Sequence, residues 1–279
     1  MLETDLLHYR LQWLSGAVYP GAHPGHTTGA GLLFKQHHPL AASSDPRRLD
    51  LRASVLDPFE YYRVRAYQQL SRIDVYLLAD LSGSMGHAGK KKILTTLLRT
   101  LARSAFGYGD RFGFIGAAEQ IEPRWLLPAG MHYEAVSRLA SQLEDAPLSG
   151  TVSGLCNASS YLPAERALLF LLTDAHFPLA HLRDLLASLQ GHDIVPLVLW
   201  DPGEYRQLPP WGLLSVRDIE SGASRILFMR PSLRERIIAA YAQRRQRLIG
   251  TFRAFGSEPL FIEHCDIPAI NRHLHQRAA

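Results

Sequence analysis

The stretch from Val75 to Met85 constrains the fold more than any other part of this 279-residue chain. An apolar run there ends in Asp80, Ser82 and Ser84, just before a helical pattern begins. A continuous apolar run is typical of a strand buried on both faces, as in a parallel sheet. Ligands bind beyond the carboxyl ends of such strands, and a buried carboxylate is costly unless it is paired. We therefore expect this stretch to be a central strand that delivers oxygen ligands to a cation.

The rest of the chain alternates strand patterns with helix patterns. Strands are predicted over 61–67, 73–79, 111–121, 124–127, 167–174 and 194–200, and helices over 90–106, 133–143 and 179–189. Such alternation predicts an α/β fold, with a mostly parallel central sheet covered by helices on both faces. Beyond residue 202 we expect a hairpin of 213–216 and 225–229 around 220–222, a basic helix over 232–255, a strand over 260–263 and a helix over 267–276. We also predict a short helix over 3–15, and no regular element in the Gly- and Pro-rich residues 19–31.

Composition narrows the class of protein. Hydrophobic residues are 47% and charged residues 20%, as in an ordinary packed protein. The net charge of +4 comes from scattered basic residues without a nucleic-acid motif, so we expect no nucleic-acid partner. Cys156 and Cys265 form no CxxC pair, and no secretory signal or apolar run of membrane-spanning length is present. The chain is therefore expected to be cytoplasmic and without a membrane span.

We expect three segments: 1–71, which packs on the core; 72–201, the core with the metal site; and 202–279, which completes the fold.

The spacing Asp-x-Ser-x-Ser favours a hard cation. A turn after a strand can aim side chains at alternate positions toward one point, and two hydroxyls with one carboxylate suit Mg²⁺, which keeps several waters. Thr151, in a separate loop, and Asp174, at the end of another apolar strand, would complete the ligand set. Mn²⁺ is the alternative ion. With few carboxylates bound directly, the ion should attract an acidic ligand from outside.

The five positions Asp80, Ser82, Ser84, Thr151 and Asp174 resemble the metal-ion-dependent adhesion site of von Willebrand factor A domains. This resemblance implies a Rossmann-like fold and a bound Mg²⁺ that grips an acidic side chain of a partner. It places the expected partner contacts at Gly83, Met85, Ser153 and His176. One departure is Ala175, where the family often has glycine.

The flanks are similar to the bacterial domain-of-unknown-function family fifty-eight. The similarity rests on Gly21-x-His23, Gly29-x-Gly31-x-x-Phe34, Asp45-x-Arg47-Arg48-Leu49-Asp50, Asp201-Pro202-x-Glu204, Leu208-Pro209 and Asp218-x-Glu220-x-Gly222. It implies an adaptor or maturation factor that works with a MoxR-type AAA+ ATPase, or with a client enzyme during metal or cofactor insertion. The run 50–54 is most similar to an MxaS-like branch, which would make methanol dehydrogenase the client. The chain departs from the family pattern at Leu51 and at Val55-Leu56.

Asp80 and Asp174 could each cap the helix that follows, but capping leaves the three hydroxyl residues unexplained. A hydrolase using Ser82 or Ser84 is the alternative to a non-enzymatic binding module, and a purely structural metal is a third hypothesis. A P-loop around Lys90 fails on spacing. For Cys156 we favour packing over a role as nucleophile, and for His23, His26, His37 and His38 we favour loop histidines over a metal site. Around His264-Cys265-Asp266, with His273 and His275, we favour solvent-exposed histidines over a metal site.

Overall fold

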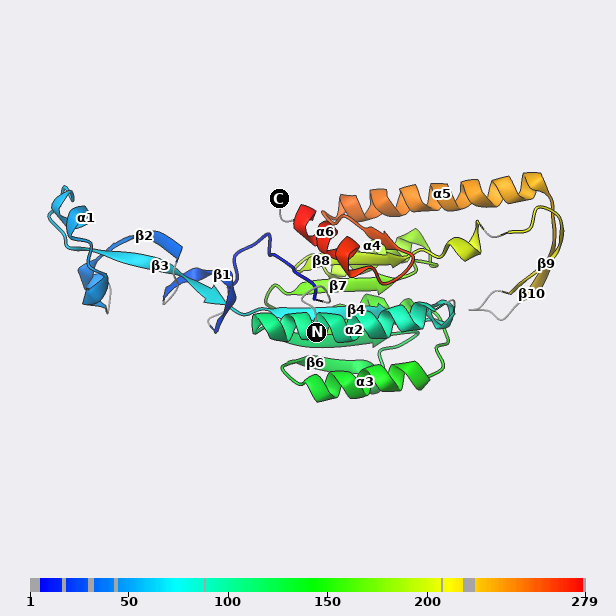
Figure 1. Cartoon of the computed structure of the whole chain (residues 1–279), viewed down its shortest axis with the longest axis horizontal. Coiled ribbons are helices and arrows are strands. Elements are labelled where there is room, and N and C mark those ends of the chain that lie inside the picture. The colour runs from blue at the N-terminus through cyan, green and yellow to red at the C-terminus, as the bar shows by residue number, and fades with distance from the viewer. Residues whose placement is uncertain are drawn as a thin grey trace. The chain divides into compact units, whose positions relative to one another are not determined.

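The computed structural model describes residues 6–16, 19–29, 33–42, 45–87, 89–206, 208–217 and 224–277. The chain divides into two compact units (Figure 1). The core unit contains Met1–Arg10, Asp74–Gly107 and Arg111–Ala279, and the N-terminal unit contains Leu11–Ile73 with Tyr108–Asp110. The predicted division into three segments stays a prediction.

A six-stranded sheet in the order β11-β8-β7-β4-β5-β6 forms the centre of the core unit. Its strands are β4 (Asp74–Asp80), β5 (Arg111–Ala117), β6 (Leu126–Gly130), β7 (Leu168–Thr173), β8 (Asp193–Leu199) and β11 (Leu260–Ile262). All neighbours pair in parallel except β5 and β6, which are antiparallel. β4 and β7 are neighbours, so their carboxyl ends meet at one edge of the sheet. The predicted α/β fold with a mostly parallel sheet is confirmed.

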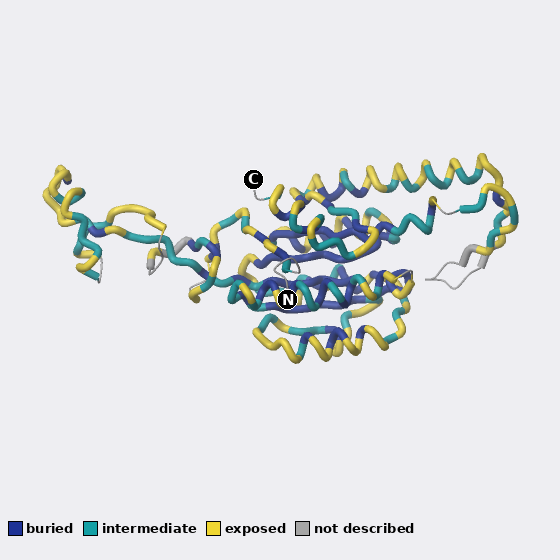
Figure 2. The backbone as a smooth tube through the Cα atoms, viewed as in Figure 1, coloured by how far each residue is buried: buried dark blue, intermediate teal, exposed yellow. Residues whose placement is uncertain are grey.

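Helices cover this sheet because its central strands are apolar on both faces. Every residue of β7 and β8 is buried, and Figure 2 colours the central strands of the core unit as buried. Residues of α4 (Leu179–Ser188), α5 (Pro231–Ala254) and the 3-10 segment η6 (Ser153–Tyr161) share one buried cluster with alternate strand residues such as Leu78 and Leu171. Figure 1 shows α2 (Lys90–Tyr108) and α6 (Ile267–Arg277) in front of the sheet, and α3 (Tyr133–Asp145) runs beside β6.

The predicted period of α2 matches its buried face. Leu94, Leu97, Leu98 and Leu101 are fully buried, as a 3.6-residue repeat requires. In β5, Gly113 leaves room for the ring of Tyr76: a Cβ at this position would lie 2.3 Å from that ring.

The predicted helix over 3–15 is wrong for the described residues 6–15, which form no helix. Within the core unit, Leu7 is fully buried, and its backbone N–H donates to Ser104 Oγ at 2.8 Å. Asn271 Oδ1 accepts from the backbone N–H of His8 at 2.8 Å. Side chains of other elements thus bind the backbone groups that a helix would have paired internally.

The N-terminal unit contains a three-stranded antiparallel sheet in the order β1-β3-β2. The strands are β1 (Pro20–Gly29), β2 (Leu33–Pro39) and β3 (Arg63–Ser71), joined by η2 (Leu40–Ala42), η3 (Pro46–Arg48) and α1 (Leu51–Val55). The expectation of no regular element over 19–31 is wrong where the structure describes these residues. β1 is an edge strand with register shifts, and edge positions tolerate the Pro and Gly residues that argued against a strand.

Two sequence motifs build this unit locally. Asp45 accepts from the N–H of Arg47, and Asp50 accepts from the N–H of Ala53, so the two acids of the motif over 45–50 cap η3 and α1. In the motif over 21–23, a Cβ at Gly21 would lie 2.2 Å from the backbone nitrogen of Arg72. This close approach of two backbones requires glycine.

His23 lies in β1 and is buried, in contrast to the predicted loop histidine. Its Nε2 lies 2.7 Å from Asp110 Oδ2, and the other carboxylate oxygen of Asp110 accepts from the N–H of Ile73 at 2.9 Å. Asp110 is fully buried. The pair therefore ties three separated positions of the N-terminal unit together.

Beyond β8 the chain forms η7 (Pro202–Glu204) and then the antiparallel pair β9 (Gly212–Arg217) and β10 (Ser224–Met229). The predicted strands of this hairpin are confirmed. The predicted turn at 220–222, like Asp218 and Gly31 of the sequence motifs, lies outside the described residues. Among the residues that the structure describes, no helix combines the length and apolar character needed to cross a bilayer.

Candidate metal centre

Asp80 is the last residue of β4 and is fully buried. Its Oδ1 accepts from the N–H of Ser82 at 2.9 Å, and its Oδ2 accepts from the hydroxyl of Thr173 at 2.7 Å. Burial and, after it, the neighbouring carboxylate of Asp174 raise the pKa of Asp80 from 3.8 to about 6. The two strand-end acids are thus close enough for their charges to interact.

Ser82 and Ser84 lie directly after the strand, in the turn formed with η4 (Gly83–Gly86). Both side chains are buried, and their Oγ atoms are 3.1 Å apart. Ser82 Oγ also hydrogen-bonds the carboxylate of Asp80. The turn therefore converges three of the predicted ligands, Asp80, Ser82 and Ser84, on one place.

Asp174 follows β7 and is 1% exposed. The next residue, Ala175, has φ of 54°, in the left-handed region that favours glycine. The hydroxyl of Thr173 accepts from the N–H of Ala175 at 2.9 Å, and the guanidinium of Arg244 donates to the carbonyl of Ala175. The chain therefore keeps the backbone conformation that glycine favours, although an alanine occupies the position.

Thr151 lies in the loop that joins the motif from another part of the chain. The N–H of Gly83 donates to the carbonyl of Gly150 at 3.1 Å, so this loop is bonded to the turn after β4. Thr151 is an exposed residue, and its hydroxyl lies 3.2 Å from Ser153 Oγ. The structure thus brings Asp80, Ser82, Ser84 and Asp174 together and holds the loop of Thr151 beside them, with the Thr151 hydroxyl paired locally.

The structure adds a cation that the sequence reasoning missed. Lys90, the first residue of α2, is 4% exposed. Its Nζ lies 2.8 Å from Asp174 Oδ2 and 2.8 Å from Glu204 Oε1. Burial by itself lowers the pKa of Lys90, but the two carboxylates outweigh burial and raise it. Two features of the sequence could have indicated this ion pair: a lysine directly after the glycine-rich turn, and the glutamate of the Asp-Pro-x-Glu motif.

Three side chains hydrogen-bond the carboxylate of Glu204. Besides Lys90, it accepts from His176 Nε2 at 2.8 Å and from the hydroxyl of Tyr241 at 3.3 Å. Burial favours the neutral acid, but the hydrogen bonds from His176 and Lys90 lower the pKa of Glu204 to about 2. The pKa of His176 is raised, because Glu204 and Asp174 outweigh the effect of burial.

The donor set fits a small hard cation. Two buried carboxylates, Asp80 and Asp174, adjoin two hydroxyl oxygens, and the ion pairs among the described residues give Asp174 a cationic partner but give none to Asp80. A buried carboxylate without a counter-charge favours cation binding or protonation. Among the described residues, no group of three or more His, Cys, Asp and Glu is arranged to hold a metal ion. A site here depends on its serine and threonine oxygens, as Mg²⁺ permits.

The expected partner contacts divide into two groups. Met85 is fully buried and Gly83 is buried, so neither presents a side chain to a partner in this conformation. Ser153 is exposed, and His176 is partly exposed but engaged by Glu204.

The other candidate residues have structural partners. Burial raises the pKa of Cys156, whose Sγ lies 3.9 Å from the carbonyl of His181. His273, for which solvent exposure was expected, is instead buried on α6, and its Nε2 lies 3.1 Å from the carbonyl oxygen of Glu258. His37 lies 3.2 Å from Asp50. These contacts favour the packing roles over nucleophilic or metal-binding ones.

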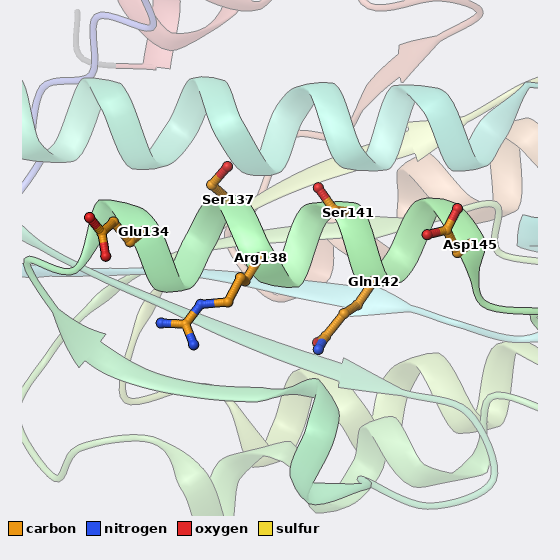
Figure 3. Close-up of a pocket in the computed structure, with 6 residues that line it drawn as sticks. All are labelled: Glu134, Ser137, Arg138, Ser141, Gln142 and Asp145. Carbon is orange, nitrogen blue, oxygen red and sulfur yellow. The ribbon is translucent and has the colours of Figure 1, made fainter.

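A pocket of about 480 Å³ lies on the exposed side of α3 (Figure 3). Its six lining residues, all polar and all on this helix, are Glu134, Ser137, Arg138, Ser141, Gln142 and Asp145. None of them belongs to the predicted centre.

Strand order, strand direction and the position of the acids define an α/β protein of the Rossmann-like, von Willebrand factor A type. The family model "Protein of unknown function DUF58" matches residues 47–247, and the chain belongs to this family.

Similar proteins include uncharacterized proteins of Mycobacterium tuberculosis and Mycobacterium bovis. Each is 22% identical over 253 residues, which cover 88% of this chain and 78% of the relative. Among solved structures, the conserved hypothetical protein BatB from Bacteroides thetaiotaomicron matches with a TM-score of 0.43 and 14% identity, over 74% of this chain and 98% of that one. The pilus adhesin SpaC from Lactobacillus rhamnosus GG matches with a TM-score of 0.44 and 13% identity, over 74% of this chain and 29% of that one.

Proposed function

We propose that the chain is a metal-dependent protein-binding module without catalytic activity of its own. Asp80, Ser82, Ser84, Thr151 and Asp174 would hold Mg²⁺, or Mn²⁺, and the ion would take an acidic side chain of another protein as a further ligand. The observation that carries this proposal is the pair of buried strand-end carboxylates beside two hydroxyls whose oxygens are 3.1 Å apart. Such a set leaves the ion electrophilic, since few negative charges contact it directly.

The resemblance of the sequence to its family supports the choice of partner. We propose a MoxR-type AAA+ ATPase, or a client enzyme that such an ATPase remodels during maturation or metal insertion, methanol dehydrogenase being the client in the MxaS-like branch. The chain would then act in the cytoplasm as an adaptor or chaperone-like factor. The chemistry of the centre requires only that the partner present an exposed Asp or Glu.

The test is capture of a purified MoxR-type ATPase by the immobilised full chain, in Mg²⁺ and in EDTA. We expect capture by wild type in Mg²⁺ only, and none by Asp80→Ala. Asp145→Ala is the matched control, because Asp145 is an exposed residue of α3 outside the centre. Capture that persists in EDTA and in Asp80→Ala would contradict the proposal.

Turnover of a phosphate or carboxylate ester by the purified chain, lost in Ser84→Ala, would instead favour the hydrolase alternative. Chelation that lowers the melting temperature while capture persists would favour a purely structural metal.

A further inference from the structure

The ammonium group of Lys90 lies between two carboxylates at the edge of the candidate centre. The side chain of Lys90 is 5% exposed, that of Asp174 is 1% exposed and that of Glu204 is 26% exposed. Both carboxylates are 2.8 Å from the same nitrogen. Water screens charges weakly at such positions, so each charge acts strongly on its neighbours. A fixed cation therefore faces the same acid that is expected to serve the divalent ion.

The Asp-Pro-x-Glu motif holds this cation in place. The carboxylate of Asp201 accepts from the N–H of Gly203 at 2.8 Å, and Pro202 begins η7, so the chain turns sharply after β8. The turn directs Glu204 to Lys90, and the hydrogen bonds from His176 and Tyr241 orient its second oxygen. The motif thus delivers a third carboxylate to the centre, bound to Lys90.

We propose that Lys90 is a positioning residue that lowers the affinity of the centre for Mg²⁺, and that Glu204 offsets part of this effect. The inference rests on the proposed metal site and adds a determinant of its affinity. The ammonium repels a divalent ion and occupies one oxygen of Asp174, whereas the carboxylate of Glu204 attracts the ion. An ion held in this way stays exchangeable, because one of its acids is shared with an internal cation.

Charge removal in opposite directions tests the inference. Lys90→Met keeps the length and apolar stem of the side chain, and we expect it to bind Mg²⁺ about tenfold or more tightly than wild type. Glu204→Gln keeps a hydrogen-bond acceptor for Lys90, and we expect it to bind about tenfold more weakly. The double variant should return close to wild type. A purely structural role would instead weaken binding in both single variants.

Lys91→Met is the matched control. It makes the same change of charge one residue further along α2, but the Lys91 ammonium donates to the carbonyl of Ala146 at 2.7 Å. We expect this variant to bind Mg²⁺ like wild type. An equal gain in Lys91→Met and Lys90→Met would attribute the effect to net charge and overturn the inference.

The measurement is titration calorimetry of the full chain with MgCl₂, with Asp80→Ala as the site-deficient reference and circular dichroism as the check on folding. Suppose that wild type binds Mg²⁺ and Asp80→Ala does not. Unchanged or weaker binding by Lys90→Met would then overturn the inference and leave the proposed function standing. If wild type binds no Mg²⁺, the inference and the proposed function both fail. If Lys90→Met does not fold, Lys90→Gln takes its place, because it keeps a hydrogen-bond donor for Asp174 and Glu204 without the charge. Tighter Mg²⁺ binding by that variant supports the inference, and unchanged or weaker binding overturns it.

Discussion

Replacing Asp80 by asparagine should stabilise the protein in chelator and destabilise it in Mg²⁺. Asp80 is fully buried beside Asp174, and burial and that neighbour raise the pKa of Asp80 from 3.8 to about 6. For an acid, a raised pKa means that the folded state disfavours the ionised form. The resulting stability is fully present below about pH 3.8 and is lost as the pH rises through about 6. The shift corresponds to about 3 kcal/mol at higher pH, as an upper limit.

The assay is urea unfolding of wild type and Asp80→Asn in EDTA between about pH 4 and pH 8. Asparagine cannot ionise, so the variant should be more stable by about 1–3 kcal/mol near pH 8 and close to wild type near pH 4. Mg²⁺ at about a thousand times its Kd should reverse the order, since a ligand at that concentration adds about 4.1 kcal/mol to the stability of the form that binds it. A variant that is less stable than wild type in EDTA at about pH 8, or a difference independent of pH, would refute this reasoning.

Three further substitutions test the packing. Asp110→Asn should lower the free energy of unfolding by about 1–3 kcal/mol, because it removes one of the two buried carboxylate oxygens that bond His23 and Ile73; urea titration measures the loss. Gly113→Val should lower the thermal midpoint by several degrees in a melting scan, because its side chain would collide with the ring of Tyr76. Leu98→Ala should cost about 2–5 kcal/mol in urea titration, because it leaves a cavity under the fully buried face of α2.

Each substitution has a matched control. Glu122→Gln changes an exposed ion pair with Arg124 and should alter stability by less than about 0.5 kcal/mol. Gly191→Val adds a side chain where no atom lies within 4 Å of the built Cβ. Leu51→Ala shortens a leucine that is 68% exposed. Losses in the controls equal to those in the test variants would contradict the packing described for these positions.

The sequence predicted the core unit well because its signals are local. A strand buried on both faces must be apolar throughout, and a helix on one face of a sheet must repeat its apolar residues every 3.6 positions. The sequences of β4 and β7 show the first pattern, and the sequence of α2 shows the second. The prediction for residues 19–31 of the N-terminal unit failed because β1 is an edge strand rich in Pro and Gly, and strand patterns are weakest in such strands. The structure of this unit depends on contacts between residues far apart in the sequence, such as His23 and Asp110, which are 87 residues apart.

The candidate centre divides in the same way. The sequence by itself determined which side chains end the two apolar strands, because the spacing of Asp80, Ser82 and Ser84 and the position of Asp174 are properties of single segments. Only the tertiary structure decided what surrounds these side chains. Lys90 and Glu204 are 114 residues apart, and they meet because the β4–α2 connection and the turn after β8 both lie beyond the carboxyl ends of the sheet strands. Ion pairs between such segments produce no periodic sequence pattern, since they depend on where the folded elements end in space.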